Sequence, residues 1–504
     1  MPDTTTNRRP RFSATSLRLR SHGPLLSLAC LLVSACAVGP DYVRPDPPLP
    51  AGWQTDGAGI SSAPAVPVGR WWDAFGDPEL SSLVDRATQA NLDLAQAVGR
   101  VAESRSLYQV TKSAQFPSLD SDAEVDRERS SINALFPGGV ESTVYSIGVS
   151  ASWEVDLFGR VRRAVESSGA KVEGSVDDRR DVLVSVIAEV AAAYVDVRTI
   201  QRRLEVAREN LASQGKIVEL TRIRHEGGFA SSLDVAQAES IYASTKTVIP
   251  PLQTQLAQAI NRLSVLLGQN PGGLGDELAQ PAPIPPRPAA LTVALPVDMV
   301  RQRPDIRQAE RQLAAQTALI GVATADLYPR LTLLGSFGFD ATDFAKLFTG
   351  PSRSYSVGPA VMWNVFDAGR IRGLIGAEEA RTAQALAFYE QKILLGLEEV
   401  ENALVTYARL EDEREATQDA IKAAYLALDL ATALYKDGLA DFQNVLDAQR
   451  TALQFDDQLA RVDGASIQSL VQLYRALGGG WSALEPPAPD KNGQDDEHGD
   501  TKQS

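Results

Sequence analysis

The stretch that decides the fold runs from Tyr145 to Val155 and reads YSIGVSASWEV. Apolar residues occupy every second position, and serine, glycine and glutamate occupy the positions between them. Side chains of a β-strand point alternately to its two faces, so this pattern predicts one apolar face and one polar face. A run of about ten such residues is also the length that a membrane-spanning β-strand needs.

A second strand of the same kind runs from Tyr355 to Val365, although Pro359 weakens its alternation. Each of the two strands follows a candidate partner strand, at residues 119–125 and 331–339. The sequence therefore predicts four membrane-length strands in each chain.

These strand pairs belong to a long internal repeat. Trp153 and Gly159 recur as Trp363 and Gly369, at an offset of 210 residues. Further pairs recur at 210 or 212 residues: Asn91 and Arg303, Phe116 and Tyr328, Gly228 and Gly438, Leu263 and Leu473, Gly268 and Gly478. A period this long does not fit a solenoid, whose repeats are about 20 to 50 residues, and instead indicates a duplicated half-unit.

The rest of each repeat is predicted to be helical, because residues 138–249 and 360–485 contain no proline. Apolar residues there follow the heptad spacing of a coiled coil, in two sets: Leu183, Ile187, Val190, Tyr194 and Val197, and Ile393, Leu397, Val400, Leu404 and Tyr407. As one helix, residues 161–226 would reach about 100 Å. That length suits a conduit across the periplasm better than a compact domain.

The N-terminus has the features of an export signal: five arginines, then an apolar run from Leu25 to Val33. Val33-Ser34-Ala35-Cys36 resembles the lipobox of bacterial lipoproteins, in which the cysteine is acylated and anchors the mature chain. Ala37 stands where an aspartate would mark retention at the inner membrane, so the outer membrane is favoured. The alternative is an ordinary signal peptide followed by an incidental cysteine.

These features divide the chain into six segments. We expect a signal peptide at 1–35, a lipidated and extended proline-rich segment at 36–70, and a first repeat at 71–268. A proline-rich linker at 269–296, a second repeat at 297–482 and a disordered polar tail at 483–504 complete the chain. The prolines of the segment at 36–70 favour an extended chain over a packed element.

Composition argues against enzymes and nucleic-acid binders. The net charge is -15, and the signal peptide carries five arginines, so the mature chain is more acidic still. The chain has three histidines, and none stands in a cluster with metal-ligand spacing. We expect no catalytic residues, no metal and no cofactor.

The strands require the chain to oligomerise. A sheet of four strands has two open edges, whose backbone groups cannot remain unpaired in lipid. Two copies would give a barrel filled by side chains, and three copies are the smallest set that leaves a lumen. The polar face would then line the lumen, and the apolar face would meet lipid. The alternative, a soluble β-sandwich, leaves no place for the long helices.

Several motifs together resemble the outer-membrane factors of the TolC and OprM type, in their lipoprotein branch (NodT type). The motifs are Cys36–Pro45, Trp71-Trp72 with Phe75 and Asp77-Pro78, Arg303-Pro304-Asp305-Ile306, Ala325–Pro329 and Ala476–Trp481. The resemblance implies a homotrimer with a twelve-stranded membrane β-barrel and a long α-helical coiled-coil barrel that narrows at its periplasmic end. It also implies a periplasmic adaptor and an inner-membrane pump, usually of the resistance-nodulation-division type, as partners.

The resemblance implies two further sets of site residues. A periplasmic gate would be formed by Gln443, Asn444 and Asp447, which share one helix face, although relatives carry Leu or Asp where Gln443 and Asn444 stand. Adaptor contacts would lie at two helix-turn tips, at Gly228 and Phe229 and at Gly438 and Leu439. The simpler interpretations are a solvated helix face and glycines that cap helices.

The sequence thus favours a passive outer-membrane duct of a tripartite efflux system. One alternative keeps the duct but couples it to an ATP-driven exporter of polypeptides. Another is a non-conducting coiled-coil lipoprotein with a structural role.

Overall fold

The computed structural model describes residues 37–55, 60–63, 69–133, 139, 141–288 and 291–485. The expected signal peptide, the expected lipid-anchor residue Cys36 and residues 486–504 lie outside the described residues. The chain divides into two compact units. The sheet unit contains Lys112–Ala164 and Ala318–Gly376 with the chain up to Pro40, and the helical unit contains Asp41–Thr111, Val165–Thr317 and the chain from Ala377 onward.

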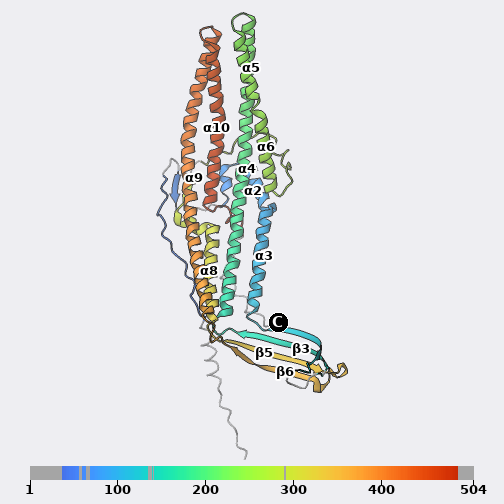
Figure 1. The fold of residues 1–504 in the computed structure, drawn as a ribbon. Helices are drawn as coiled ribbons and strands as arrows, with labels where there is room; N and C mark the ends of the chain where they lie inside the picture. The colour runs from blue at the N-terminus through green and yellow to red at the C-terminus, as the bar shows by residue number, and fades with distance from the viewer. Residues whose placement is uncertain are drawn as a thin grey trace, which may run out of the picture. The chain divides into compact units, whose positions relative to one another are not determined.

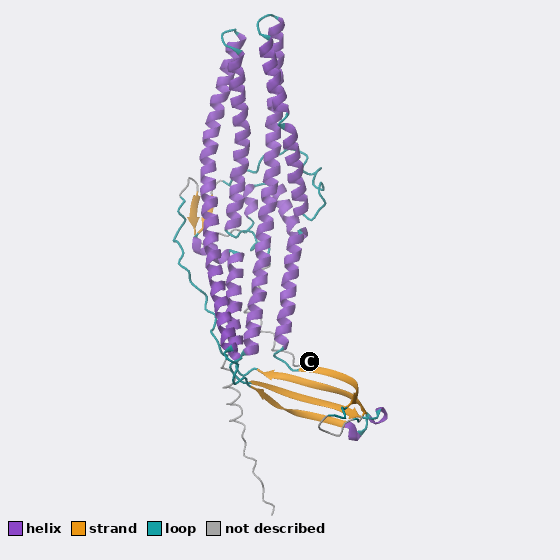
Figure 2. Ribbon diagram, viewed as in Figure 1, coloured by secondary structure: helices purple, strands orange, loops and turns teal. Residues whose placement is uncertain are grey.

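The sheet unit is built on four antiparallel strands, as the sequence predicts (Figures 1 and 2). They are β2 (Ser118–Arg129), β3 (Glu141–Val155), β5 (Arg330–Ala341) and β6 (Arg353–Met362). Their order in the sheet is β2-β3-β5-β6, so β2 and β6 each have one unpaired edge. Short 3-10 turns, η2 (Phe344–Lys346) and η3 (Gly350–Ser352), connect β5 to β6.

The register of the sheet separates apolar from polar side chains. Val149 lies opposite Ser121 and Phe337, and Phe337 lies opposite Tyr355, so these residues share one face. The same face carries further apolar residues: Leu119, Ala123, Val125, Ile147, Trp153, Leu331, Leu333, Phe339, Val357 and Val361. The opposite face is acidic along β2, where it carries Asp120, Asp122, Glu124, Asp126 and Glu128. All five of these carboxylates are exposed.

Pro359 lies inside β6, opposite Leu333. In the sequence, this proline interrupts the alternation that predicts a strand. The strand order explains why it is tolerated. Because β6 is an edge strand, a residue without an N–H group can sit there without breaking a central ladder.

The helical unit is organised around two helices of 67 residues, α4 (Arg160–Glu226) and α9 (Arg370–Lys436). At 1.5 Å per residue each is about 100 Å long. In Figure 1, α5 and α6 lie beside α4, and α10 lies beside α9. The remaining helices are η1 (Trp71–Phe75), α2 (Pro78–Ala90), α3 (Leu92–Ser113), α5 (Ser232–Lys246), α6 (Ile249–Leu266), α7 (Pro296–Gln302), α8 (Pro304–Ala325) and α10 (Phe442–Ala476).

The heptad residues form the core of the helical unit. All five of the first set are buried, and so are Ile393, Val400 and Leu404 of the second. They pack in one cluster with the aromatic residues that open the first repeat, where the Trp71 ring stacks on Tyr474 with centroids 5.0 Å apart. Burial of these apolar side chains is the main stabilising contribution to the long helices.

The duplication is visible in the backbone as well as in the sequence. Three pairs of glycines with positive φ recur at the offset of 210 residues: Gly159 and Gly369, Gly228 and Gly438, Gly268 and Gly478. The indole of Trp153 donates to the Gln115 carbonyl at 3.0 Å, and Trp363 donates to the Leu327 carbonyl at the same distance. The repeats differ where Pro250 and Pro251 start α6, because α10 continues without a break through the corresponding region.

The proline-rich segment that follows Cys36 in the sequence is extended but packed where the structure describes it. The hydroxyl of Tyr42 donates to Glu310 at 3.1 Å, and the indole of Trp53 donates to the Ala294 carbonyl at 2.9 Å. The expectation of an unpacked lead-in is therefore wrong for residues 41–55, whose aromatic side chains bind to the helical unit. A further four-residue strand, β1 (Ile60–Ala63), pairs in parallel with β4 (Leu291–Ala294) and was not predicted.

Candidate functional site

The ends of α4 and α9 form two equivalent tips. At the first, Gly228 has a φ of 78° and the Phe229 N–H donates to the Arg224 carbonyl. At the second, Gly438 has a φ of 73°, and the Leu439 N–H donates to the Leu434 carbonyl. Both are Schellman caps, which require a left-handed residue that glycine supplies without strain.

Each cap presents an apolar side chain to solvent. Phe229 is 76% exposed and Leu439 is 75% exposed, although the residue at this position of a Schellman cap often packs on its own helix. Between the tips, the Arg224 guanidinium donates to the Lys436 carbonyl at 2.7 Å and lies over the Tyr435 ring. The two hairpins of the chain are therefore joined by a contact that sequence reasoning missed, since its partners are 212 residues apart.

The structure brings Gln443, Asn444 and Asp447 together on one exposed face of α10. Phe442 and Val445, on the opposite face, are buried. The Gln443 amide donates to Asp447 Oδ1 at 3.1 Å, which gives the carboxylate a defined orientation. Arg450 lies 3.7 Å from the same oxygen, and both side chains of this ion pair are more than half exposed.

Arg303, from the motif that begins α8, is a structural centre, by which we mean that its one guanidinium group holds several segments of the chain together. Its guanidinium forms a bidentate pair with Asp305, at 3.0 and 2.9 Å, and donates to Glu399 and to the Ala476 carbonyl, each at 2.7 Å. In the first repeat Asn91 donates to the Leu266 carbonyl in the same way. The motif thus ties the start of one helix to the end of another in both repeats.

Two carboxylates near this centre have shifted pKa values. Burial alone raises the pKa of Asp305, but the hydrogen bonds and charge of Arg303 outweigh it and hold that pKa below its ordinary value. Burial, together with the charge of Asp305, raises the pKa of Asp181 to about 6, against the opposing charges of Arg303, Lys392 and Arg475.

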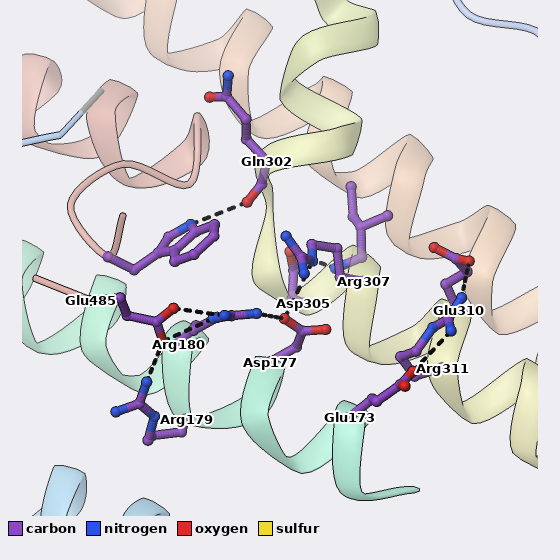
Figure 3. A network of polar contacts seen from close by, with 12 residues as sticks. Glu173, Asp177, Arg179, Arg180, Gln302, Asp305, Arg307, Glu310, Arg311 and Glu485 are labelled. Atoms are coloured by element: carbon purple, nitrogen blue, oxygen red, sulfur yellow. Dashed lines mark hydrogen bonds and ion pairs between the residues drawn. The ribbon is translucent and has the colours of Figure 1, made fainter. Parts of the chain in front are cut away.

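The C-terminal clasp, defined as Trp481 and Glu485, fastens the end of the described chain (Figure 3). The Trp481 indole donates to the Gln302 carbonyl at 3.2 Å, and Glu485 pairs with Arg179 and Arg180. The prediction that a disordered polar tail begins at residue 483 is therefore wrong for residues 483–485, because two guanidinium groups hold Glu485. No local pattern reveals this pair, whose members are 305 residues apart.

The described ranges contain no group of three or more histidine, cysteine or carboxylate side chains that could hold a metal ion. His225 has the turn role expected from its position, with Nδ1 2.9 Å from the Ala230 carbonyl. Among the same residues, no helix has the length and apolar character needed to cross a bilayer.

Comparison with known proteins identifies the family. A family model described as "Outer membrane efflux protein" matches residues 83–269 and 295–479. The chain belongs to the outer membrane efflux protein family. The match falls on both copies of the duplicated half-unit, and it leaves out the segment that precedes α2.

Individual relatives agree with this family. The outer membrane efflux protein is 32% identical over 449 residues to "Nodulation protein T" of Rhizobium leguminosarum bv. trifolii, across 89% of this chain and 94% of the relative. It is also 32% identical over 467 residues to "Toluene efflux pump outer membrane protein TtgI" of Pseudomonas putida, across 91% and 98% of the two chains. A solved structure of the outer-membrane channel OprN superimposes with a TM-score of 0.83 at 37% identity, covering 88% of this chain and all of that one.

This outer membrane efflux protein is therefore a transport channel component of the outer membrane, and it is not an enzyme. The comparisons confirm the resemblance on which the sequence analysis relies.

Arg303→Ala should lower stability strongly. The substitution leaves the buried Asp305 carboxylate without its cation, which costs about 3–5 kcal/mol for a buried pair. Thermal unfolding followed by circular dichroism measures the loss. The matched control is Arg409→Ala, which breaks an exposed pair with Asp412 and should cost at most about 1 kcal/mol. Equal losses in the two variants would contradict the role of Arg303 as a structural centre.

Asp181→Asn should stabilise the protein in a pH-dependent manner. A raised pKa means that the folded state binds the proton more tightly than the unfolded chain, so the charged carboxylate destabilises the fold above about pH 6. This cost disappears as the pH falls toward the ordinary carboxyl value. We expect the melting temperature to rise more at pH 7.5 than at pH 4.5, whereas the exposed control Asp412→Asn should show no such difference. A gain that is the same at both pH values would contradict the assignment.

Proposed function

We propose that this chain is one subunit of a homotrimeric duct that crosses the outer membrane and the periplasm and passively exports solutes. The proposal rests on one observation: the four-stranded sheet has an apolar face, an acidic face and two unpaired edges. In a bilayer those edges must be paired, and three copies supply the twelve strands that close a ring around a lumen. The acidic face then lines the lumen.

The duplication supports a specific junction between subunits. At the repeat offsets, β3 corresponds to β6 and β5 corresponds to β2. Inside the chain Ala151 lies opposite Gly335, where β3 pairs with β5. The same offsets place Val361 of one copy opposite Ala123 of the next. Both residues belong to the apolar face, so the junction continues the two faces of the sheet around the ring.

The ends of the duct follow from the same arrangement. An acylated Cys36 would hold each subunit in the outer membrane, consistent with an apolar signal segment before it. The exposed apolar side chains at Gly228-Phe229 and Gly438-Leu439 would contact a periplasmic adaptor. The face with Gln443, Asn444 and Asp447 would form the periplasmic gate, where three copies of the carboxylate meet around one axis and attract cations.

The partners are then a periplasmic adaptor and an inner-membrane pump, of the resistance-nodulation-division type. A relative named for toluene efflux supports the export of small solutes over the alternative of an ATP-driven polypeptide exporter.

Deletion of the gene should lower the minimal inhibitory concentrations of compounds in a drug and solvent panel. Unchanged susceptibility across the panel would count against solute efflux.

Ala123→Cys combined with Val361→Cys should cross-link neighbouring subunits. The two positions face each other across the proposed junction, and opposite residues of paired strands lie within reach of a disulfide or a short bifunctional linker. Oxidation of membranes followed by denaturing electrophoresis should give covalent dimers and trimers. The control pairs Ala123→Cys with Ala360→Cys, which lies on the opposite face of β6 and should not react. If the chain stays monomeric in detergent and in lipid and forms no cross-link, the proposal of a trimeric duct is wrong.

Asp447→Ala should reduce the preference of the channel for cations. Removal of three carboxylates from the narrowest point weakens the local negative potential, so the cation-to-anion permeability ratio should fall roughly several-fold. Reversal potentials in planar bilayers under a KCl gradient measure the ratio. Glu277→Ala, in the loop after α6, removes the same charge away from the proposed gate and should leave the ratio unchanged. An unaltered ratio in Asp447→Ala would place the gate elsewhere.

A further inference from the structure

The helical unit contains a cavity of about 520 Å³ that is rich in arginine. Its walls come from the segment after Asp41, from α4, and from α7 and α8. Five guanidinium groups line it, those of Arg44, Arg180, Arg301, Arg307 and Arg311. The chain as a whole has a net charge of -15, so this local cluster of positive charge is opposite in sign to the charge of the rest of the protein.

Three carboxylates share the cavity, and two of them position the arginines. Asp177 is only 5% exposed and pairs with Arg180 at 2.7 Å and with Arg307 at 3.3 Å. Glu310 is 6% exposed and pairs with Arg311 at 2.5 Å and with Arg44 at 3.4 Å. Each carboxylate thus fixes two guanidinium groups, and Figure 3 shows Arg180 and Arg307 around Asp177 and Arg311 beside Glu310.

These carboxylates do not neutralise the cavity. With Glu173, which pairs with Arg311, the lining has three negative charges against five positive ones, and Glu485, which pairs with Arg180 from outside the lining, leaves an excess of one positive charge. Within the described part of the chain, the Arg301 side chain forms no hydrogen bond or ion pair, and Arg307 is paired with Asp177 through Nε alone, so its two terminal nitrogens have no acceptor. Because Asp177 holds the Arg307 guanidinium at Nε, little side-chain order is lost when its open terminal N–H groups bind an oxyanion, and the exposed Arg301 adds a second positive charge.

We propose that this cavity is a binding site for a multiply charged oxyanion, with Arg301 and Arg307 as its principal donors. Phosphate oxygens and clustered carboxylates share the required chemistry, since both accept paired hydrogen bonds from guanidinium groups. Two sources could supply it. One is a small anion from the surroundings, and the other is the end of the chain itself, where residues 486–504 contain five acidic and two lysine residues.

The second source is joined to the cavity by a contact. Glu485, the residue that precedes this acidic stretch, pairs with Arg180, and Arg180 lines the cavity. Trp481 also lies near the site, because the guanidinium groups of Arg180 and Arg307 are 4.5 and 5.5 Å from its ring centroid. A bound anion would connect the segment after Asp41, α4 and α8, and would stabilise the folded chain.

The test measures binding of inorganic phosphate to the full-length protein by calorimetry, together with the melting temperature. We expect Arg301→Glu to weaken phosphate binding by at least about tenfold, because it removes a free donor and adds a negative charge. The Arg301 side chain is exposed and forms no side-chain hydrogen bond or ion pair within the described residues, so this variant should fold normally. Arg307→Ala should weaken binding as well, whereas the exposed control Arg409→Ala should not change it.

A chain that ends at Glu485 separates the two sources. If the acidic stretch occupies the cavity, its removal should tighten phosphate binding, and the added affinity should again depend on Arg301. If the ligand is a free anion, the shortened chain should bind phosphate as the full chain does. Both results support the site. The proposed site would be overturned if neither chain bound phosphate in a way that depends on Arg301 and Arg307. The proposed duct does not rest on this result, because its channel conductance would be unaffected.

Discussion

The backbone groups along the outer edges of β2 and β6 are the constraint on which the rest of the structure depends. A strand edge in water is satisfied by solvent, but in hydrocarbon each unpaired N–H or C=O group costs several kcal/mol. A four-stranded sheet with a lipid-compatible face therefore has no stable place in a bilayer as a single copy. In the proposed duct, folding of the sheet in the membrane and association of subunits would therefore be one process, and the long helices would take the symmetry of the ring.

The helical unit meets a different requirement, which is to hold two very long helices straight without a broad core. The solution is a narrow apolar stripe supported by polar contacts at the ends of the shorter helices. Arg303 joins the start of α8 to the end of α10, and Asn91 does the same for α3 and α6. The proline-rich segment and the C-terminal clasp then bind along the outside of this framework.

Much of this architecture could be predicted from the sequence, because periodic patterns report local geometry. The alternation from Tyr145 to Val155 and the heptads around Ile187 fix the strands and the buried helix faces. Packing of Tyr42 and Trp53, the clasp at Glu485 and the arginine cavity were missed. Each of these depends on partners more than a hundred residues apart, and no periodic signal encodes such a pairing. Gln443, Asn444 and Asp447 were placed correctly on one face by helical spacing alone, whereas their role came from family resemblance.

The duplicated half-unit also gives the chain a built-in comparison of two solutions to one backbone. Where both halves keep the same residue, as at Gly228 and Gly438, the shared left-handed conformation is reason enough. Where they differ on the same backbone, as at Phe229 and Leu439, the conformation does not dictate the residue, so its choice reflects some other requirement. Reading one half against the other thus separates residues that the fold dictates from residues free to specialise, without reference to any second protein.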